Sequence, residues 1–412
     1  MFQLNNGQER VVQAAIDWFR NSSEQVFQYS GNAGTGKSVV LHEIIRRLQL
    51  TDVEVAPMSF IGAAAIVMRT KGLYNARTIH SWLYNPVEDV ARDKEGKVIM
   101  NEYLNRPVYR LTFEPKPLPP LTKLIIVDEA GAVPVELKKE IESRNIKVLA
   151  CGDLDQLPPV GGNPGYLTSG KIYILDEIMR QAQNSVIVYL AQRAKQGLPI
   201  QKGIYNEVEV IDEDELEDYH LQMADMVICG KNSTRNYINK RVREDIFHRT
   251  NILPMHGDKV VCRKNNWGIE SNGINLVNGL IGEVTNYPDI SRFNGKFFTI
   301  DFKPYNLVSF FPNIDIDYKY FITPCGSKSE LVNDRFSRYE KFEYAYCITT
   351  HISQGSQYRR GVYLEEYLNK LYNNNLNYTG ITRFSDYLIY VKRKRKFYWL
   401  NDKIVIYYNR DV

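Results

Sequence analysis

The octapeptide GNAGTGKS at residues 31–38 limits the fold of this chain more than any other stretch. It matches the pattern G-x-x-x-x-G-K-[ST], in which backbone N–H groups and the positive end of a helix surround the phosphates of a nucleotide. An apolar run at residues 26–29 predicts a strand before it, and apolar residues at helical spacing through residue 48 predict a helix after it. A chance glycine-rich turn would lack this context. We therefore expect a phosphate-binding loop with contacts from Gly34, Thr35, Gly36, Lys37 and Ser38.

A second group of candidate residues has the chemistry that phosphoryl transfer requires. Lys37 would reach the β- and γ-phosphates of ATP, and the Ser38 hydroxyl would ligate Mg²⁺. Asp128 and Glu129 end the apolar run at residues 124–127, and a carboxylate at the C-terminal end of a buried parallel strand faces the crevice where α/β sheets bind ligands. We expect Asp128 to hold Mg²⁺ and Glu129 to polarise the attacking water. For such an acidic pair alone, a strand-end turn without function is the common alternative.

Three further side chains are candidates for contacting the transferred phosphate. Gln156, in the polar turn 152–159, could orient water or sense the γ-phosphate. Arg180 and Arg383 each stand beside a turn or a helix start, and a guanidinium at the γ-phosphate accelerates transfer by a factor on the order of 10³–10⁵. If Arg383 belongs to a second domain, it reaches ATP only when the two domains close. Taken alone, either arginine is more often a surface residue.

The order of predicted strands and helices indicates more than one α/β domain with a parallel sheet. At 412 residues the chain is too long for one compact core. Strands and helices alternate over residues 1–82 and 121–185, which predicts a doubly wound first domain. Residues 83–120 interrupt this alternation with charged residues, a turn and a proline cluster, so we expect an inserted subdomain that carries a hairpin.

A second α/β domain is predicted over residues 186–282 and 341–412. Residues 283–340 separate its two parts, and short strands divided by turns predict a small inserted β-barrel there. The same all-β pattern extends from Asp258 to Phe342.

Composition excludes several classes of protein. The five cysteines lie far apart without a C-x-x-C pair, so the sequence predicts neither a zinc site nor a disulfide framework. The N-terminus lacks the features of a secretion signal, and no apolar run approaches the roughly 20 residues of a membrane span. We expect a cytoplasmic protein without membrane contact, either in a bacterial cytosol or as a viral protein in its host. The net charge of +4 does not decide whether it binds nucleic acid.

Taken together, these segments resemble the motifs of superfamily 1 helicases, specifically the 5′→3′ branch (superfamily 1B) that includes Dda-type phage helicases and RecD-like enzymes. The similarity covers nearly the whole chain. The matching segments are residues 4–8, 31–38, 56–64, 78–81, 128–130, 152–159, 180–181, 351–356 and 378–383. The resemblance implies two RecA-like domains, 1A and 2A, with a pin-bearing insertion 1B and an SH3-like insertion 2B at the two interruptions described above.

The resemblance also implies additional site residues. Gln8 would read the adenine of ATP, and Gly355 would contribute to nucleotide binding. The residues that it implies for DNA contact are Pro57, Thr78, His80, His351 and Ser353. The segment that is similar to motif Ia departs from the family pattern because it lacks the usual basic residue. Phe113 and Pro115 are candidates for the wedge that separates strands.

The activity implied by the resemblance is that of an ATP-dependent DNA helicase, which moves 5′→3′ on single-stranded DNA and unwinds duplex junctions. Hydrolysis would occur at the interface of the two RecA-like domains. We expect a monomer, with a single-strand-binding or replisome protein as a candidate partner. The alternatives are an RNA-directed helicase, a translocase that displaces proteins without separating strands, and a nucleotide-switched nucleic-acid-binding module. Glu129 and Arg383 disfavour the last alternative, since a switch needs binding residues more than water activation.

Overall fold

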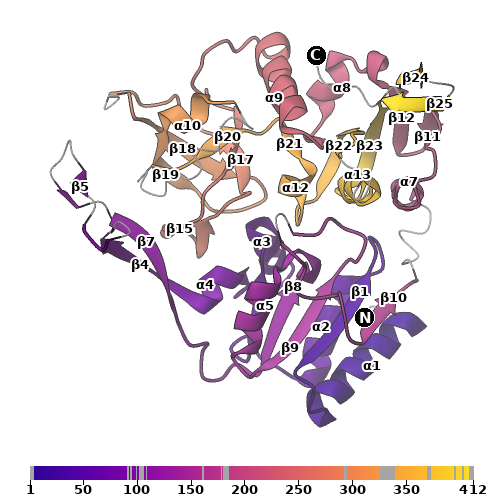
Figure 1. Ribbon diagram of the computed structural model, residues 1–412, viewed down its shortest axis with the longest axis vertical. Coiled ribbons are helices and arrows are strands. Elements are labelled where there is room, and N and C mark those ends of the chain that lie inside the picture. Colours follow the sequence, from indigo (N-terminus) through magenta and orange to yellow (C-terminus); the bar gives the residue numbers. More distant parts are fainter. Residues whose placement is uncertain are drawn as a thin grey trace.

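The computed structural model describes residues 4–90, 92, 95–98, 100–101, 106–107, 109–159, 162–177, 179, 185–291, 295–324, 339–368, 373–393, 396–400 and 403–407. Two α/β domains lie one above the other in Figure 1, and the two β-rich insertions lie on one side of them. No described helix is long and apolar enough to cross a membrane.

The first α/β domain is built on a six-stranded parallel sheet in the order β10-β1-β9-β8-β2-β3. Its strands are β1 (Val26–Gly31), β2 (Val55–Ser59), β3 (Arg77–Thr78), β8 (Leu124–Asp128), β9 (Lys147–Gly152) and β10 (Ile172–Leu175). Its helices are α1 (Asn6–Asn21), α2 (Lys37–Leu48), α3 (Gly62–Thr70), α4 (Ile79–Leu83), the 3₁₀ turn η1 (Ala130–Ala132) and α5 (Val135–Glu142).

Strand β8 shows why the strands of this sheet have apolar residues at successive positions. Leu124 and Ile126 belong to the core under α1 and α2, whereas Ile125 and Val127 belong to the core under α4 and α5. Successive side chains of a strand point to opposite faces, and helices cover both faces here. All four residues are therefore buried, which leaves Asp128 as the first polar residue at the end of the strand.

The first insertion carries a hairpin. Strand β4 (Tyr84–Val90) pairs antiparallel with β7 (Tyr109–Pro115), and the short strands β5 (Met100–Asn101) and β6 (Arg106–Pro107) extend it outward. The hairpin projects from the first domain toward the outside of the molecule below the second insertion (Figure 1).

The second α/β domain repeats this plan with the sheet order β11-β12-β23-β22-β13-β21. Only β11 runs antiparallel to its neighbour. The strands are β11 (Gly203–Tyr205), β12 (Val208–Asp212), β13 (Met226–Cys229), β21 (Cys347–Thr349), β22 (Tyr358–Leu364) and β23 (Phe384–Lys392). The helices are α7 (Val186–Lys195), η2 (Glu213–Glu215), α8 (Asp218–Met223), α9 (Asn232–Lys240), the π-helix η3 (Arg241–Ile246), α12 (Thr350–Ser353) and α13 (Asn373–Ile381), and the hairpin β24 (Lys396–Leu400) and β25 (Lys403–Tyr407) follows.

The second insertion is a small barrel-like sheet in the order β19-β18-β17-β14-β20, with a hairpin of β15 and β16 attached. Its elements are β14 (Lys259–Cys262), β15 (Asn266–Ser271), β16 (Ile274–Leu276), β17 (Ile281–Val284), β18 (Phe297–Pro304), β19 (Phe311–Asp317), α10 (Tyr318–Ile322) and β20 (Phe342–Tyr344). Glu340, just before β20, bonds through its backbone to β19, which brings the two edges of the sheet together.

This sheet extends on both sides of the range 283–340 that the sequence predicted for it. The wider all-β pattern from Asp258 to Phe342 includes β14 and the first residue of β20. The apolar run at residues 344–348 is also divided. Tyr344 ends β20 of the insertion, whereas Cys347 begins β21 of the second parallel sheet.

A buried carboxylate fixes the start of this insertion to the second domain. Asp258 is fully buried and accepts hydrogen bonds from Arg243 Nε at 3.1 Å, Arg249 Nη1 at 2.5 Å, the Tyr346 hydroxyl at 2.6 Å and the Met255 N–H at 2.7 Å. Removing Asp258 would leave the buried Arg243 and the partly buried Arg249 without this counter-charge.

We expect Asp258→Ala to destabilise this domain by about 3–5 kcal/mol, because breaking a buried ion pair leaves an uncompensated charge. Urea unfolding followed by circular dichroism measures the effect. Asp386→Ala is the matched control, since Asp386 pairs with Arg359 at 2.7 Å on the surface and its loss should leave the unfolding midpoint unchanged. Equal midpoints for the two variants would contradict the role assigned to Asp258.

Candidate active site

The phosphate-binding loop connects β1 to α2 at the C-terminal edge of the first sheet. Gly34 and Gly36 both have φ of +81°, a conformation that favours glycine. A Cβ on Gly36 would lie 2.5 Å from Gln8 Nε2 and 2.8 Å from Met179 Sδ, so these side chains would have to shift to admit a larger residue. The backbone thus adopts the turn that the sequence pattern predicts, at the start of helix α2.

Lys37 lies inside this loop. Its Nζ donates to the Gly31 carbonyl at 2.6 Å and stands 3.9 Å from Asp153 Oδ2, whose side chain is fully buried. Asp153 follows β9, the strand next to β1, which explains how a residue so distant in sequence reaches the loop. The lysine is therefore held among oxygen atoms at the edge where phosphates are expected.

Gln8, predicted to read adenine, is buried and bonded to the loop. Asn5 and Gln8 form a capping box at the start of α1, and Gln8 Nε2 donates to the Thr35 carbonyl at 2.9 Å. This places α1 directly against the loop. The contact adds a support for the loop that the sequence pattern alone did not indicate.

The two acids lie where β8 ends. Asp128 Oδ1 accepts the Glu129 N–H at 3.0 Å and the Cys151 thiol at 3.3 Å, and Glu129 adopts φ of +51°. Burial and then the neighbouring Asp128 carboxylate raise the pKa of Glu129, while Arg383 and Lys37 oppose that rise. A carboxylate with a raised pKa is a better proton acceptor, as a base that activates water must be. Lys37 from the first domain and Arg383 from the second therefore act on the same carboxylate.

Ser38 and Asp128 provide oxygen atoms of the kind that Mg²⁺ prefers. Among the described residues, no group of three or more His, Cys, Asp or Glu side chains could hold a metal ion by itself. Mg²⁺ is commonly held by one or two carboxylates together with substrate phosphates and water. The pair fits an ion that enters with a nucleotide, and the Ser38 hydroxyl meanwhile accepts from Lys71 Nζ at 3.3 Å.

The arginine side of the site comes from the second domain. Arg383, at the junction of α13 and β23, is buried, and its Nε donates to the Thr379 carbonyl at 3.1 Å. The Thr379 hydroxyl accepts the Leu157 N–H at 3.2 Å, and Gln354 Nε2 donates to the Leu157 carbonyl at 3.1 Å. Gln156 precedes this doubly bonded residue and is partly buried in the same turn. The predicted sensor turn therefore lies at the domain interface.

Gly355 lies at the same interface but against a helix of the first domain. A Cβ on Gly355 would lie 2.6 Å from Ala64 Cβ and 2.8 Å from Ala64 N, and its φ is +75°. Glycine is required here by a close approach between the domains. Arg180, the remaining candidate for contact with phosphate, lies outside the described residues.

Two of the residues predicted to contact DNA are buried. Pro57 lies within β2, where its carbonyl accepts Trp82 Nε1 at 2.7 Å. Ser353 is fully buried, and its hydroxyl donates to the Thr350 carbonyl at 2.8 Å. In this conformation neither side chain reaches a surface, and direct DNA contact at both positions stays a prediction.

A third residue predicted to contact DNA, Thr78, is also buried, whereas His80 and His351 are partly buried. Thr78 caps α4 by accepting the Ser81 N–H at 3.2 Å, and His80 follows it at the start of that helix. His351 is partly buried in α12, and burial lowers its pKa, as it does for His80. Neutral rings of this kind can stack on or bond to a base.

An aromatic row that the sequence analysis did not predict joins the first domain to both insertions. His80 lies 6.2 Å from Phe60 and 6.0 Å from Tyr84, between ring centroids. Phe113 of the hairpin lies 6.3 Å from Tyr84 and packs edge-on against Trp267 of β15 at 5.2 Å. Pairs so far apart in sequence leave no local signal, so only the fold reveals the row.

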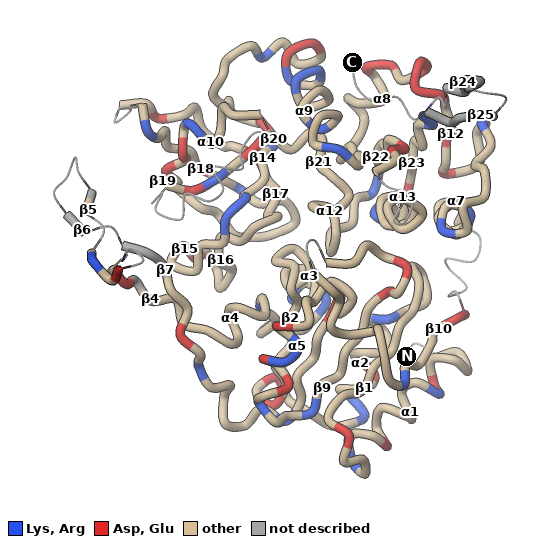
Figure 2. Tube along the Cα trace, viewed as in Figure 1, with Lys and Arg blue, Asp and Glu red and all other residues tan. Residues whose placement is uncertain are grey.

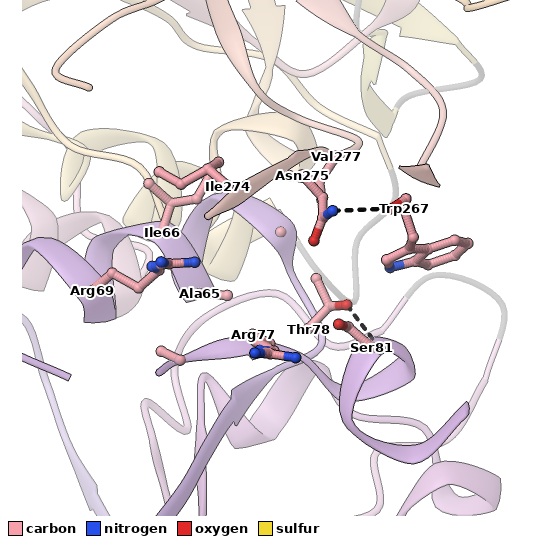
Figure 3. Close-up of a pocket in the computed structure, with 12 residues that line it drawn as sticks. Ala65, Ile66, Arg69, Arg77, Thr78, Ser81, Trp267, Ile274, Asn275 and Val277 are labelled. Atoms are coloured by element: carbon pink, nitrogen blue, oxygen red, sulfur yellow. Dashed lines mark hydrogen bonds between the residues drawn. The ribbon is translucent and has the colours of Figure 1, made fainter. Parts of the chain in front are cut away.

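A small cavity of about 30 Å³ lies beside Trp267, between α3, β3 and α4 of the first domain and the β15–β16 hairpin. Figure 3 shows Arg69 on the left of the cavity and Trp267 on the right, with Asn275 above and Arg77 below. Arg69 also donates to the Gly273 carbonyl of the hairpin, and the Trp267 N–H has no hydrogen-bond partner among the described residues. The cavity thus combines cationic, apolar and unpaired polar groups.

Comparisons with known proteins give the same fold. The chain is 30% identical over 171 residues to the ATP-dependent DNA helicase RRM3 of Saccharomyces cerevisiae, covering 38% of this chain and 21% of that protein. It is 25% identical over 328 residues to the ATP-dependent DNA helicase Pif1 of a Psychrobacter species, covering 66% of this chain and 46% of that protein. The structure of Bacteroides Pif1 helicase in complex with ADP-AlF3 and single-stranded DNA superposes with a TM-score of 0.53, at 17% identity and over 95% and 92% of the two chains.

The chain spans less than half the length of these two curated relatives. A family model described as an AAA domain matches residues 3–215. These residues include the phosphate-binding loop, both acids and the turn 152–159, and they make up more than half of the 412 residues. The chain therefore belongs to the AAA domain family.

Proposed function

We propose that this protein is an ATP-dependent DNA helicase of superfamily 1B, which moves 5′→3′ on single-stranded DNA and separates duplex strands. One observation carries the proposal. Burial raises the pKa of Glu129, and two cations oppose that rise: Arg383 of the second domain and Lys37 of the phosphate-binding loop. A site assembled from two domains links hydrolysis to their relative movement.

In this proposal, Lys37 binds the β- and γ-phosphates of ATP, and Glu129 accepts a proton from the attacking water. Ser38 and Asp128 would hold Mg²⁺, which neutralises charge on the phosphates when bound. Arg383 stabilises the charge of the transferred group when the domains close, with Gln156 orienting the water between them. Opening after hydrolysis then releases the second domain, so that each cycle moves one domain relative to the other.

The relatives support DNA as the polymer along which this protein moves. RRM3 and Psychrobacter Pif1 are named as ATP-dependent DNA helicases, and the Bacteroides Pif1 structure contains single-stranded DNA. In this chain, the aromatic row offers faces on which bases can stack, and stacking contributes about 1–3 kcal/mol per base. Arg69 and Arg77 beside it supply positive charge for the phosphates.

Lys37→Ala should abolish ATP hydrolysis, and Arg383→Ala should lower the DNA-stimulated turnover number by about 10³-fold or more. Nucleotide binding by the arginine variant should stay within a few-fold of wild type, because Arg383 acts only after the domains close. Steady-state ATPase assays with and without single-stranded DNA, together with binding of a fluorescent nucleotide, measure both effects.

Arg359→Ala is the matched control for the arginine, since Arg359 is exposed and pairs with Asp386 at the surface. It should hydrolyse ATP at the wild-type rate. Turnover by Arg383→Ala within about threefold of wild type would instead favour a nucleotide-switched binding module.

The direction of movement is tested with forked DNA that carries only a 5′ or only a 3′ single-stranded tail. We expect strand separation on the 5′-tailed substrate alone, measured by release of a labelled strand. RNA forks and protein-blocked single strands serve as comparison substrates. Preference for the 3′ tail, or for RNA, would contradict the proposal.

Trp267→Ala should weaken binding of single-stranded DNA by about 5–100-fold, because one stacked aromatic contributes about 1–3 kcal/mol. Fluorescence anisotropy of a labelled oligonucleotide measures it. Tyr237→Ala is the control, as Tyr237 is an exposed aromatic residue of α9 in the second domain. If both variants bind equally well, the aromatic row is not the DNA track.

A further inference from the structure

Tyr378 of the second domain reaches the phosphate-binding loop of the first. It lies in α13, five residues before Arg383, and is fully buried. Its hydroxyl accepts the Ala33 N–H at 3.0 Å and donates to Asp153 Oδ2 at 2.7 Å. One hydroxyl therefore joins the loop, the acid beside Lys37 and the helix that leads to the arginine.

The hydroxyl keeps its proton in this environment. Burial, and then the negative charge of Asp153, raise the pKa of Tyr378 far above its usual value. A protonated hydroxyl has one hydrogen to donate and lone pairs to accept, which matches its two partners. The Asp153 side chain, fully buried, thereby gains a donor in addition to the Asp155 N–H at 3.0 Å.

The other polar contacts across the interface lie outside the loop. Thr379 and Gln354 bond to Leu157, and Asn375 Nδ2 donates to the Asp155 carbonyl at 2.9 Å. Lys195 pairs with the Asp155 carboxylate at 2.5 Å. These contacts hold the second domain to the turn 152–159, whereas Tyr378 bonds to the residues that surround the phosphates.

We propose that Tyr378 is a positioning residue that latches the phosphate-binding loop to the second domain. Its two hydrogen bonds form together only when Ala33 and Asp153 are aligned and the domains are closed. The same closure brings Arg383 to Glu129. The latch itself concerns only the contact between the two domains. Its effect on hydrolysis rests on the function proposed above.

The effect of removing this hydroxyl can be estimated from the hydrogen bonds that it makes. In Tyr378→Phe the ring and its packing remain, while Ala33 and the buried Asp153 each lose a partner in the closed arrangement only. A hydrogen bond to a charged group corresponds to about a tenfold to hundredfold change in an equilibrium or a rate. The effect should appear in closure, and not in the binding of ATP to the first domain.

Hydrogen–deuterium exchange tests the latch without reference to activity. The amide of Ala33 should exchange about tenfold faster or more in Tyr378→Phe than in wild type, measured by mass spectrometry of fragments from residues 31–38 in the nucleotide-free protein. Tyr363→Phe is the matched control, because the Tyr363 hydroxyl is also buried and donates to Asn377 Oδ1 at 2.8 Å, within the second domain. Unchanged exchange at Ala33 in Tyr378→Phe would overturn the latch.

ATPase kinetics test its consequence. Tyr378→Phe should lower the DNA-stimulated turnover number about tenfold to hundredfold with the KM for ATP within about threefold of wild type, whereas Tyr363→Phe should retain wild-type values. A rise in KM without a fall in turnover would overturn the positioning role. If the wild-type protein shows no DNA-stimulated hydrolysis while Ala33 exchange still accelerates in Tyr378→Phe, the latch stands and the helicase proposal fails.

Discussion

A single carboxylate at the boundary between two domains sets the conditions for the rest of the site. Burial makes ionisation of Glu129 unfavourable, and the nearby Asp128 adds to that cost. The compensating charges come from Lys37 in one domain and Arg383 in the other. Because the attraction between charges falls with distance, the state of this carboxylate depends on how far apart the domains are. Ionisation of Glu129 and separation of the domains are therefore coupled.

The interface that surrounds this carboxylate is polar and made of separate contacts. It includes the bonds to Leu157 and Asp155, the hydroxyl of Tyr378 and the approach of Gly355 to Ala64. A net hydrogen bond contributes only about 0.5–1.5 kcal/mol. The apolar cores, by contrast, lie within each domain, on the two faces of its own sheet. Such an interface can open and close without unfolding either domain, and Figure 2 shows acidic and basic residues distributed over both.

Sequence patterns predicted the two parallel-sheet domains because their signals are local. Apolar strands, helical spacing and the loop at residues 31–38 each lie within a few residues of chain. The range 283–340 was too narrow for the second insertion because it divided an all-β pattern that runs from Asp258 to Phe342. The side chains of Pro57 and Ser353 were assigned by their place in a motif. A motif position does not tell which way a side chain points.

Residues that meet across the fold could not be predicted at all. Trp267 and Phe113 belong to different insertions, and Tyr378 lies hundreds of residues from its partner Ala33. Each has an ordinary local context, and its role follows from a contact that exists only after both domains and both insertions have formed. The candidates at the phosphate-binding loop and at the end of β8 could be found earlier because strand, turn and chemistry occur together in the chain.

The short step from the second insertion into the second sheet has a mechanical consequence. Strand β20 ends at Tyr344 and β21 begins at Cys347, and the residues between them are buried. Strand β21 then runs into α12 and Gly355, which rests on Ala64. A short, buried connection transmits a force between the elements that it joins. A pull on the barrel would thus be transmitted to Gly355 and Ala64, where the two domains meet.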